Sequence, residues 1–190
     1  EKPLREMDFS DEERLKMRGF QFLSAKPLLI VLNYSEEDIS REEQILQPLQ
    51  DFTKKPKVDL TGLCARVEQE ISQLDEEDKQ LFMDDLQISQ AALDKLIQKS
   101  YDLLGLQSFF TMTENECRAW TIRRGTNAQK AAGIVHSDME RGFIRAEVVH
   151  FNEFGKTGSL TRCRENGTLR LEGKSYIVQD GDIIQFRFNV

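Results

Sequence analysis

The chain has 190 residues, 39% hydrophobic and 31% charged, which suits one large or two small soluble domains. No stretch approaches the roughly 18 to 20 apolar residues of a membrane span, and the charged opening Glu1–Arg5 lacks the apolar core of a signal peptide. Three widely separated cysteines and two histidines without metal-binding spacing argue against a disulfide framework and a zinc enzyme. We therefore expect a cytoplasmic protein with no membrane partner.

The charge is distributed unevenly along the chain. Residues 1–106 hold 14 basic and 23 acidic side chains, a net charge of −9, whereas residues 107–190 hold 12 and 10, a net of +2. A DNA-binding domain is usually far more basic, so we predict no DNA specificity. An ordinary solvated surface is the alternative to a nucleic-acid patch in the second part. The side chains assigned here to RNA or partner phosphates are Arg118, Arg123, Arg124, Lys130, Arg141 and Arg145.

The first part of the chain alternates between helical and strand patterns. Ser10–Glu13 and Ser40–Glu43 have the spacing of a capping box and predict two helix starts, the first helix reaching about Phe22 and the second interrupted near Pro48. The apolar run Leu28–Leu32 predicts a central strand of a parallel sheet, covered on both faces. A strand is expected over residues 56–60, followed by a turn at Thr61-Gly62 and a helix over residues 65–74. The next helix begins at Asp75 and has Leu81, Phe82 and Leu86 as its apolar stripe. A last helix is expected over residues 92–104.

From residue 107 the hydrophobic period changes to two. Strands are expected over residues 109–112, 117–122, 143–149 and 184–190, with a hairpin around Gly173-Lys174 and turns over residues 113–116 and 180–182. Gly125-Thr126-Asn127 is a suitable cap region for a helix through His136. Ile144, Ala146 and Val148 share one strand face. A hairpin, then a helix, then further strands is the order of a ubiquitin-like β-grasp. The fold expected is therefore an α/β part followed by an α+β part.

A polar loop follows the first predicted strand. Ligands of open α/β sheets bind beyond the carboxyl ends of strands. Asn33 can offer a donor and an acceptor to a purine edge, and Glu36 can accept from a ring or exocyclic N–H. P-loop GTPases place Asn-Lys-x-Asp at such a loop to select guanine, whereas this chain has Asn-x-x-Glu. Taken alone, the pattern favours a solvated loop, because Asn-x-x-Glu occurs by chance in most proteins.

Long motifs in the second part resemble the YchF/Obg-like ATPase family. They are Arg118–Ile122, Ala131–Asp138, Arg141–Val148, Leu169–Asp182 and the ending Phe186–Val190. In that family this region is the TGS domain, a β-grasp shared with threonyl-tRNA synthetases and stringent-response enzymes. The resemblance covers nearly the whole chain, because residues 26–36 match the last G-domain strand with an altered base-specificity motif.

The resemblance implies three segments. Residues 1–25 correspond to the end of a helical (coiled-coil) insertion, residues 26–106 to the C-terminal part of a P-loop G domain, and residues 107–190 to the TGS domain. Residues 61–65 resemble the next nucleotide-facing loop. The base contacts that follow from this likeness are Asn33, Tyr34, Glu36, Thr61, Gly62 and Leu63.

The sequence contains no Gly-x-x-x-x-Gly-Lys-Ser/Thr string and no Walker-B Asp-x-x-Gly after a strand. In the family both lie upstream of residue 1, so the resemblance implies a longer parent that binds ATP or GTP with Mg²⁺ and associates with ribosome or RNA. For this chain alone we expect no cofactor, no catalytic residue and no hydrolysis. The alternative is a stand-alone module that binds ribosome, RNA or protein without nucleotide function.

Five other residues suggest chemistry but fit structural roles better. Cys64 near a helix start can be a low-pKa nucleophile, yet a buried structural thiol is favoured. His136 fits a helix-end residue better than a general base, and Trp120 fits strand packing better than base stacking. Asp180 and Asp182 flank a glycine, which is typical of turn chemistry.

Overall fold

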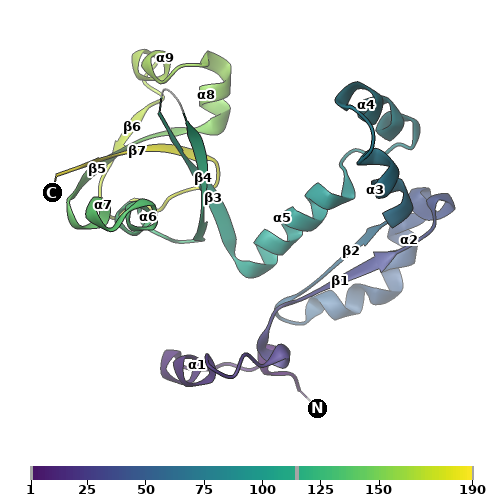
Figure 1. Ribbon diagram of the computed structural model, residues 1–190. Helices are drawn as coiled ribbons and strands as arrows, with labels where there is room; N and C mark the ends of the chain where they lie inside the picture. The colour runs from purple at the N-terminus through teal and green to yellow at the C-terminus, as the bar shows by residue number, and fades with distance from the viewer. Residues whose placement is uncertain (1, 114–115, 190) are drawn as a thin grey trace. The chain divides into compact units, whose positions relative to one another are not determined.

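A computed structural model describes residues 2–113 and 116–189 and divides the chain into two compact units, residues 1–104 and 105–190 (Figure 1). Each unit is built around its own sheet, a two-stranded sheet in the first and a five-stranded one in the second. In the part of the chain that the structure describes, no helix has both the length and the apolar content needed to cross a bilayer.

Residues 2–27 contain short helical turns joined by loops. Helix α1 (Asp11–Met17) begins with the predicted capping box, in which Ser10 and Glu13 bond each other's backbone N–H groups. The helix ends at Met17 rather than at Phe22, because Gln21 has a left-handed backbone with φ 52° that a helix cannot contain. Two 3₁₀ turns, Leu4–Glu6 and Leu23–Ala25, flank it.

The sheet of the first unit pairs two parallel strands. Strand β1 (Leu28–Asn33) runs beside β2 (Val58–Leu63) in a register that joins Leu28 to Val58 and Asn33 to Leu63. The predicted parallel strand is confirmed, but its cover on both faces is wrong, since Leu28 and Val31 are each 41% exposed. The predicted turn at Thr61-Gly62 is also wrong, because the β1–β2 ladder continues through both residues.

Helical segments connect and follow these strands. They are a 3₁₀ turn Glu36–Arg41, α2 (Glu42–Leu46), a 3₁₀ segment Gln47–Lys54, α3 (Ala65–Ile71), α4 (Glu76–Asp85) and α5 (Ala92–Leu104). Helix α4 begins at the predicted place, and Asp75 caps it by accepting from the Asp78 N–H. Ser40 caps nothing, because it lies inside the 3₁₀ turn and Arg41 precedes α2.

The buried residue of α4 is Met83, not the predicted Leu81, which is 68% exposed. Met83 packs with Cys64, Val67 and Ile71, the small core of this unit.

The second unit has a five-stranded mixed sheet in the order β4-β3-β7-β5-β6. Strand β3 pairs parallel with β7, and the other neighbours are antiparallel. The strands are β3 (Leu106–Met112), β4 (Cys117–Arg123), β5 (Phe143–His150), β6 (Arg170–Glu172) and β7 (Asp182–Phe188). The predicted tip of the β3–β4 hairpin includes residues 114 and 115, which lie outside the described residues. Val190, the end of the last predicted strand, also lies outside them.

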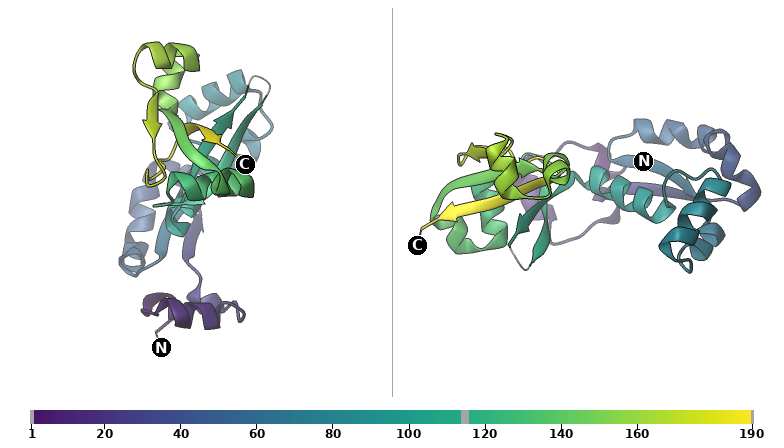
Figure 2. Two further views of the ribbon diagram at one scale, coloured as in Figure 1. Left: turned by 90° about the vertical axis from the view of Figure 1, so that its left-hand side faces the viewer. Right: turned by 90° about the horizontal axis from the view of Figure 1, so that it is seen from above.

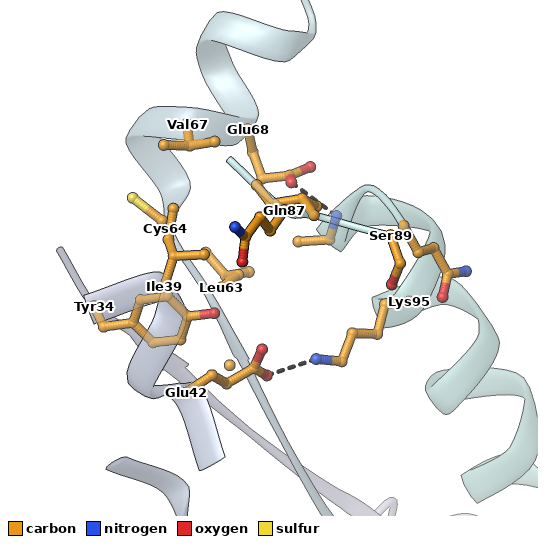
Figure 3. A pocket seen from close by; sticks show the side chains of 14 residues that line it. Tyr34, Ile39, Glu42, Leu63, Cys64, Val67, Glu68, Gln87, Ser89 and Lys95 are labelled. Atoms are coloured by element: carbon orange, nitrogen blue, oxygen red, sulfur yellow. Dashed lines mark hydrogen bonds and ion pairs between the residues drawn. The ribbon is translucent and has the colours of Figure 1, made fainter. Parts of the chain in front are cut away.

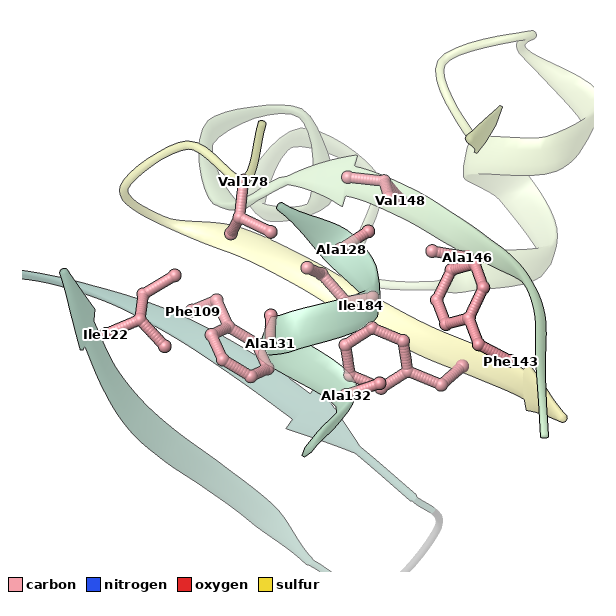
Figure 4. Packing of buried hydrophobic residues seen from close by; sticks show 11 residues of the cluster. Phe109, Ile122, Ala128, Ala131, Ala132, Phe143, Ala146, Val148, Val178 and Ile184 are labelled. Atoms are coloured by element: carbon pink, nitrogen blue, oxygen red, sulfur yellow. The ribbon is translucent and has the colours of Figure 1, made fainter. Parts of the chain in front are cut away.

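Helices cover both faces of this sheet (Figure 2). On one face α6 (Ala128–Val135) and α7 (Ser137–Arg141) close a core in which Phe109, Ala132 and Ile184 are at most 1% exposed (Figure 4). On the other face α8 (Phe151–Thr157) and α9 (Leu160–Glu165) pack over Val149 and Ile183. The mixed sheet with a crossing helix capped by Asn127 is as predicted.

Two details of this sheet differ from the predictions. A bulge between Phe143 and Arg145 turns Ile144 outward, where it is 58% exposed, so it does not share the face of Ala146. The predicted hairpin at Gly173-Lys174 is absent from the described residues, because β6 pairs with β5 and the chain then loops away to bring Tyr176 against Asp182.

A buried carboxylate ties α9 to the sheet. Glu147 of β5 is 7% exposed and accepts from Arg164 of α9 at 2.8 Å and from Arg187 of β7 at 3.2 Å. Hydrogen bonding from Arg187 outweighs the effect of burial and lowers the pKa of Glu147 below its ordinary range. The ionised form therefore stabilises the folded unit.

We expect Glu147→Gln to reduce the free energy of unfolding by about 1–3 kcal/mol at neutral pH, because charge-assisted hydrogen bonds are lost at a buried position. A lowered folded pKa means that this contribution is complete above about pH 4.3 and disappears as pH falls through the folded value. Chemical denaturation at several pH values measures both. The control is Glu172→Gln, whose carboxylate lies 3.8 Å from Arg170; an equal loss in both variants would contradict the assignment.

Candidate functional site

The candidate site lies where β1 and β2 end together. The Tyr34 N–H donates to the Leu63 carbonyl at 3.0 Å, and the Ala65 N–H donates to Asn33 Oδ1 at 3.0 Å. The Asn33 side chain thus joins the end of β1 to the first turn of α3. Its amide nitrogen makes no hydrogen bond to any described residue, so it keeps two N–H donors for a ligand.

An open pocket of about 610 Å³ adjoins this junction. Three of the predicted base-binding residues, Asn33, Tyr34 and Glu36, line it together. Glu36 is exposed and forms no ion pair with a described residue, which leaves its carboxylate as an acceptor. The remaining lining residues are Ser35, Glu37, Cys64, Arg66 and Leu86.

A second pocket of about 260 Å³ is lined by Tyr34 together with residues of β2, α3 and α5 (Figure 3). Gly62 and Leu63 line this pocket, not the first, so the six predicted residues are divided between two hollows. Tyr34 lines both. A Cβ on Gly62 would lie only 2.6 Å from Tyr34 Cε1, which explains why a glycine stands inside this strand.

Thr61 does not reach either of these two pockets. It is 2% exposed in the middle of β2, where it pairs with Val31, and its hydroxyl oxygen is a buried atom without a hydrogen-bond partner among the described residues. The strand continues to Leu63, one residue beyond the turn expected at Thr61-Gly62, and this places the Thr61 side chain away from both pockets.

The Tyr34 hydroxyl belongs to a polar network in the second pocket. Burial raises its pKa well above the ordinary range of a tyrosine, and the Glu42 carboxylate beside it adds to the rise. Glu42 is in turn 2.5 Å from Lys95 of α5, and Glu68 accepts from the Ala92 N–H at 2.8 Å. Tyr34 therefore stays a neutral hydroxyl at any physiological pH.

Sequence reasoning missed several residues of the two pockets. Cys64 lines both, and Arg66 adds a side chain that is 79% exposed at the rim of the first. Their position directly after the second strand was the available signal, since α3 starts where β2 ends. Glu42 and Lys95 are 53 residues apart, and no local pattern joins them.

The predicted basic cluster of the second unit is not one patch. Arg118 lies on the α6 side of β4 with Trp120, whereas Arg123 lies on the opposite side of the same strand, because strand residues alternate. Lys130 is paired with Glu140 at 2.7 Å, and Arg141 with Asp138. Arg145 lies on β5, two strands beyond β3 in the sheet. The six cations are thus spread over both faces, and two of them are compensated by carboxylates.

The structural interpretations of the other candidate residues are confirmed. Cys64 is 6% exposed in a hydrophobic cluster, and His136 Nδ1 accepts from the Asp138 N–H at the start of α7. The Trp120 indole donates to Thr111 at 2.8 Å.

Both aspartates of the turn before β7 accept backbone hydrogen bonds. Asp180 accepts from the Ser108 N–H, and Asp182 from the Gln179 N–H and the Tyr176 hydroxyl. Burial and Asp182 raise the pKa of Tyr176 to about 12. Among residues 2–113 and 116–189 no group of His, Cys, Asp and Glu side chains has the geometry of a metal site.

Comparisons with known proteins give a consistent result. Residues 106–189 match the family described as YchF-GTPase_C, protein of unknown function (DUF933). The ribosome-binding ATPase YchF of Bacillus subtilis (strain 168) is 43% identical over 193 aligned residues, which cover 100% of this chain and 52% of that protein. Obg-like ATPase 1 of Xenopus laevis is 36% identical and matches 96% of this chain and 46% of its own length.

Solved structures agree with these relatives. The Schizosaccharomyces pombe YchF GTPase superimposes with a TM-score of 0.79 at 30% identity, covering 98% of this chain and 50% of its own. A GTP binding protein from Pyrococcus horikoshii OT3 has a TM-score of 0.59 at 14% identity, a likeness of fold alone. The chain spans about half the length of the curated relatives that it matches.

The close approach of Gly62 and Tyr34 can be tested by a double-mutant cycle. We expect Gly62→Ala to lower the free energy of unfolding by about 1–3 kcal/mol, because the added methyl group displaces the Tyr34 ring. The loss should shrink when Tyr34→Ala is present, as measured by chemical denaturation. Gly19→Ala is the control, since nothing lies within 4 Å of that position. Equal losses with and without the ring would show that Tyr34 is not the obstacle.

Proposed function

Because the chain belongs to the YchF/Obg-like ATPase family, whose C-terminal part it matches, we propose that it supplies the base-binding side and the partner-binding domain of a longer nucleotide-dependent protein. In this proposal residues 1–25 end a helical insertion, residues 26–106 complete a P-loop G domain, and residues 107–190 are a TGS β-grasp. Ribosome association by the parent implies that it acts in the cytoplasm.

One observation carries the nucleotide part of the proposal. Asn33 and Glu36 line a single open pocket at the carboxyl ends of two parallel strands, the place where ligands bind in α/β sheets. A free amide nitrogen and a free carboxylate are the groups that read a purine edge. Asn33 holds α3 with its oxygen and keeps its N–H donors, which suit an acceptor such as a purine ring nitrogen.

Glu36 sets the choice between the two purines in this proposal. Guanine selection by Asn-Lys-x-Asp proteins needs a carboxylate that pairs with two N–H groups of the base. Glutamate places its carboxylate about one methylene farther out, and a lost bidentate contact costs on the order of 1–3 kcal/mol. Adenine offers only one exocyclic amine, so its binding suffers less. Mg²⁺ accompanies the phosphates in the parent, while the residues of this chain contact the base only.

We expect the intact parent to bind ATP at least as well as GTP, as measured by isothermal titration of each nucleotide. Replacing Glu36 by Asp should shift the preference towards GTP by about fivefold or more, because the shorter side chain restores the reach of the guanine-selecting carboxylate. Glu37→Asp is the matched control, since Glu37 lines the same pocket. A hundredfold preference of the unaltered parent for GTP, roughly 2.7 kcal/mol, would rule out this role for Glu36.

The second unit is proposed to contact the ribosome. Relatives of this chain are named as ribosome-binding ATPases, and residues 107–190 have a net charge of +2 against −9 for the rest. Ribosomal RNA is polyanionic, so it favours this unit over the acidic one. Arg123 is the last residue of β4, and Arg124 follows it directly.

Replacing Arg123 and Arg124 by Ala should weaken ribosome binding by the parent and flatten its salt dependence by about one unit of log K per lost phosphate contact. Sedimentation with ribosomes at several salt concentrations measures both effects. Lys130→Ala with Arg141→Ala removes the same charge from side chains that already face carboxylates, so its effect should be smaller. If the folded Arg123/Arg124 variant binds the ribosome as tightly as the unaltered parent, the ribosome contact lies elsewhere. If residues 105–190 alone bind the ribosome as tightly as the parent, a stand-alone module without nucleotide function is favoured.

A further inference from the structure

We propose that the outer edge of strand β4 binds an extended acidic peptide, which adds to the sheet of the second unit as one more strand. This interaction surface is separate from the nucleotide pocket and shares only Arg123 with the ribosome contact proposed above, so it goes beyond that function. Strand addition uses backbone hydrogen bonds for affinity and side chains for selectivity.

The backbone of β4 is available for such a partner. β4 is the terminal strand of the sheet, with β3 as its neighbour, and no described strand pairs with its other edge. The Arg124 N–H donates to Gly105 at 2.9 Å and the Thr113 N–H to Glu116 at 2.8 Å, so the even-numbered residues of β4 bond to β3. The odd-numbered residues, among them Cys117 and Ala119, direct their backbone groups outward.

The charge around this edge selects the partner. Strand β4, Cys117–Arg123, contains two arginines and no aspartate or glutamate, although the whole chain has a net charge of −7. Arg118 and Arg123 lie near the two ends of β4. Carboxylates that flank a short apolar strand would meet both. A second copy of β4 is disfavoured, because it would add two more arginines and no carboxylate to this edge.

The surroundings of Trp120 favour a peptide over RNA. An RNA site of this type would offer an aromatic face for base stacking. The Trp120 ring is already covered by the Arg118 guanidinium at 4.2 Å, its indole N–H is bound to Thr111, and its body packs on the core. The other edge of the sheet is less suitable for an acidic strand, because β6 has three residues and ends in Glu172.

The sharpest variant is Ala119→Pro in the full chain. Proline removes the outward N–H and places its ring on the open edge, but it leaves the β3–β4 hydrogen bonds intact because the Ala119 N–H does not bond to β3. Ala119→Ser keeps the N–H and is the matched control. Arg118→Glu tests the charge without changing the backbone.

The probe is a fluorescent peptide with a Val-Ile-Val-Ile core followed by a run of glutamates, measured by anisotropy. We expect it to bind the unaltered chain and Ala119→Ser alike, and to bind Ala119→Pro and Arg118→Glu about tenfold or more weakly. A peptide with lysines in place of the glutamates should bind poorly. Hydrogen exchange on the unaltered chain should show protection of the Cys117 and Ala119 amides when the acidic peptide is present, which holds even if the proline variant fails to fold.

Three results would overturn the proposal. They are equal binding by a folded Ala119→Pro variant, no added protection of the Cys117 and Ala119 amides, and no binding of the acidic peptide to the unaltered chain. An oligouridylate that displaces the peptide and binds Ala119→Pro as well as the unaltered chain would also overturn it, since that outcome identifies the edge as an RNA surface read by side-chain charge.

Discussion

The parallel register of β1 and β2 is the constraint on which the candidate site depends. Six consecutive residue pairs, from Leu28 with Val58 to Asn33 with Leu63, end both strands at the same level. Asn33 then reaches the first N–H of α3, so a loop and a helix start that are 32 residues apart become one polar edge. A shift of one residue would reverse the faces of every side chain and remove this junction.

The second unit depends on a different constraint, the close approach of a helix to a sheet. Ala128, Ala131 and Ala132 of α6 are all 0% exposed, and their small side chains let the helix backbone come close to the aromatic layer beneath it. Phe109 and Phe186 meet edge to face there, with ring centroids 5.9 Å apart. The strands on which the partner surface is proposed are therefore held by a dense core.

The sequence predicted helix starts well where the stabilising contacts join residues close together in the chain. The caps at Ser10 and Asn127 and the helix start at Asp75 are confirmed, because a side chain and an N–H three residues on are sufficient to form each cap. Ser40 carries the same spacing but caps nothing, since three consecutive acidic residues, Glu36 to Asp38, already open a 3₁₀ turn before it. Local spacing alone does not say which of two competing starts the chain will use.

What could not be predicted depends on partners distant in sequence. The length of β2 follows from pairing with β1, and the exposure of Ile144 follows from a bulge against β7. The helices α8 and α9 escaped notice because they are short, at seven and six residues, and are held by contacts such as Arg164 with Glu147 rather than by a strong periodic pattern. The base-loop residues could be named from the sequence, but their division between two pockets could not.

Because Tyr34 lines both pockets, it connects the loop after β1 to α5, whose residues line the second pocket. None of the described residues of α5 is fully buried, and Leu93 and Ile97 are 61% and 49% exposed. The helix is instead held by polar contacts, from Glu68 to its first N–H groups, from Glu42 to Lys95 and from Asp59 to Lys99.

Half-buried contacts of this kind are strong only while their geometry is kept, because each partner regains water when they separate. Glu42 lies beside both the Tyr34 hydroxyl and Gly62, so the position of that ring and the attachment of α5 are set by the same carboxylate. Tyr34, which lines both pockets, is thus placed by the same carboxylate that holds the last helix of the first unit.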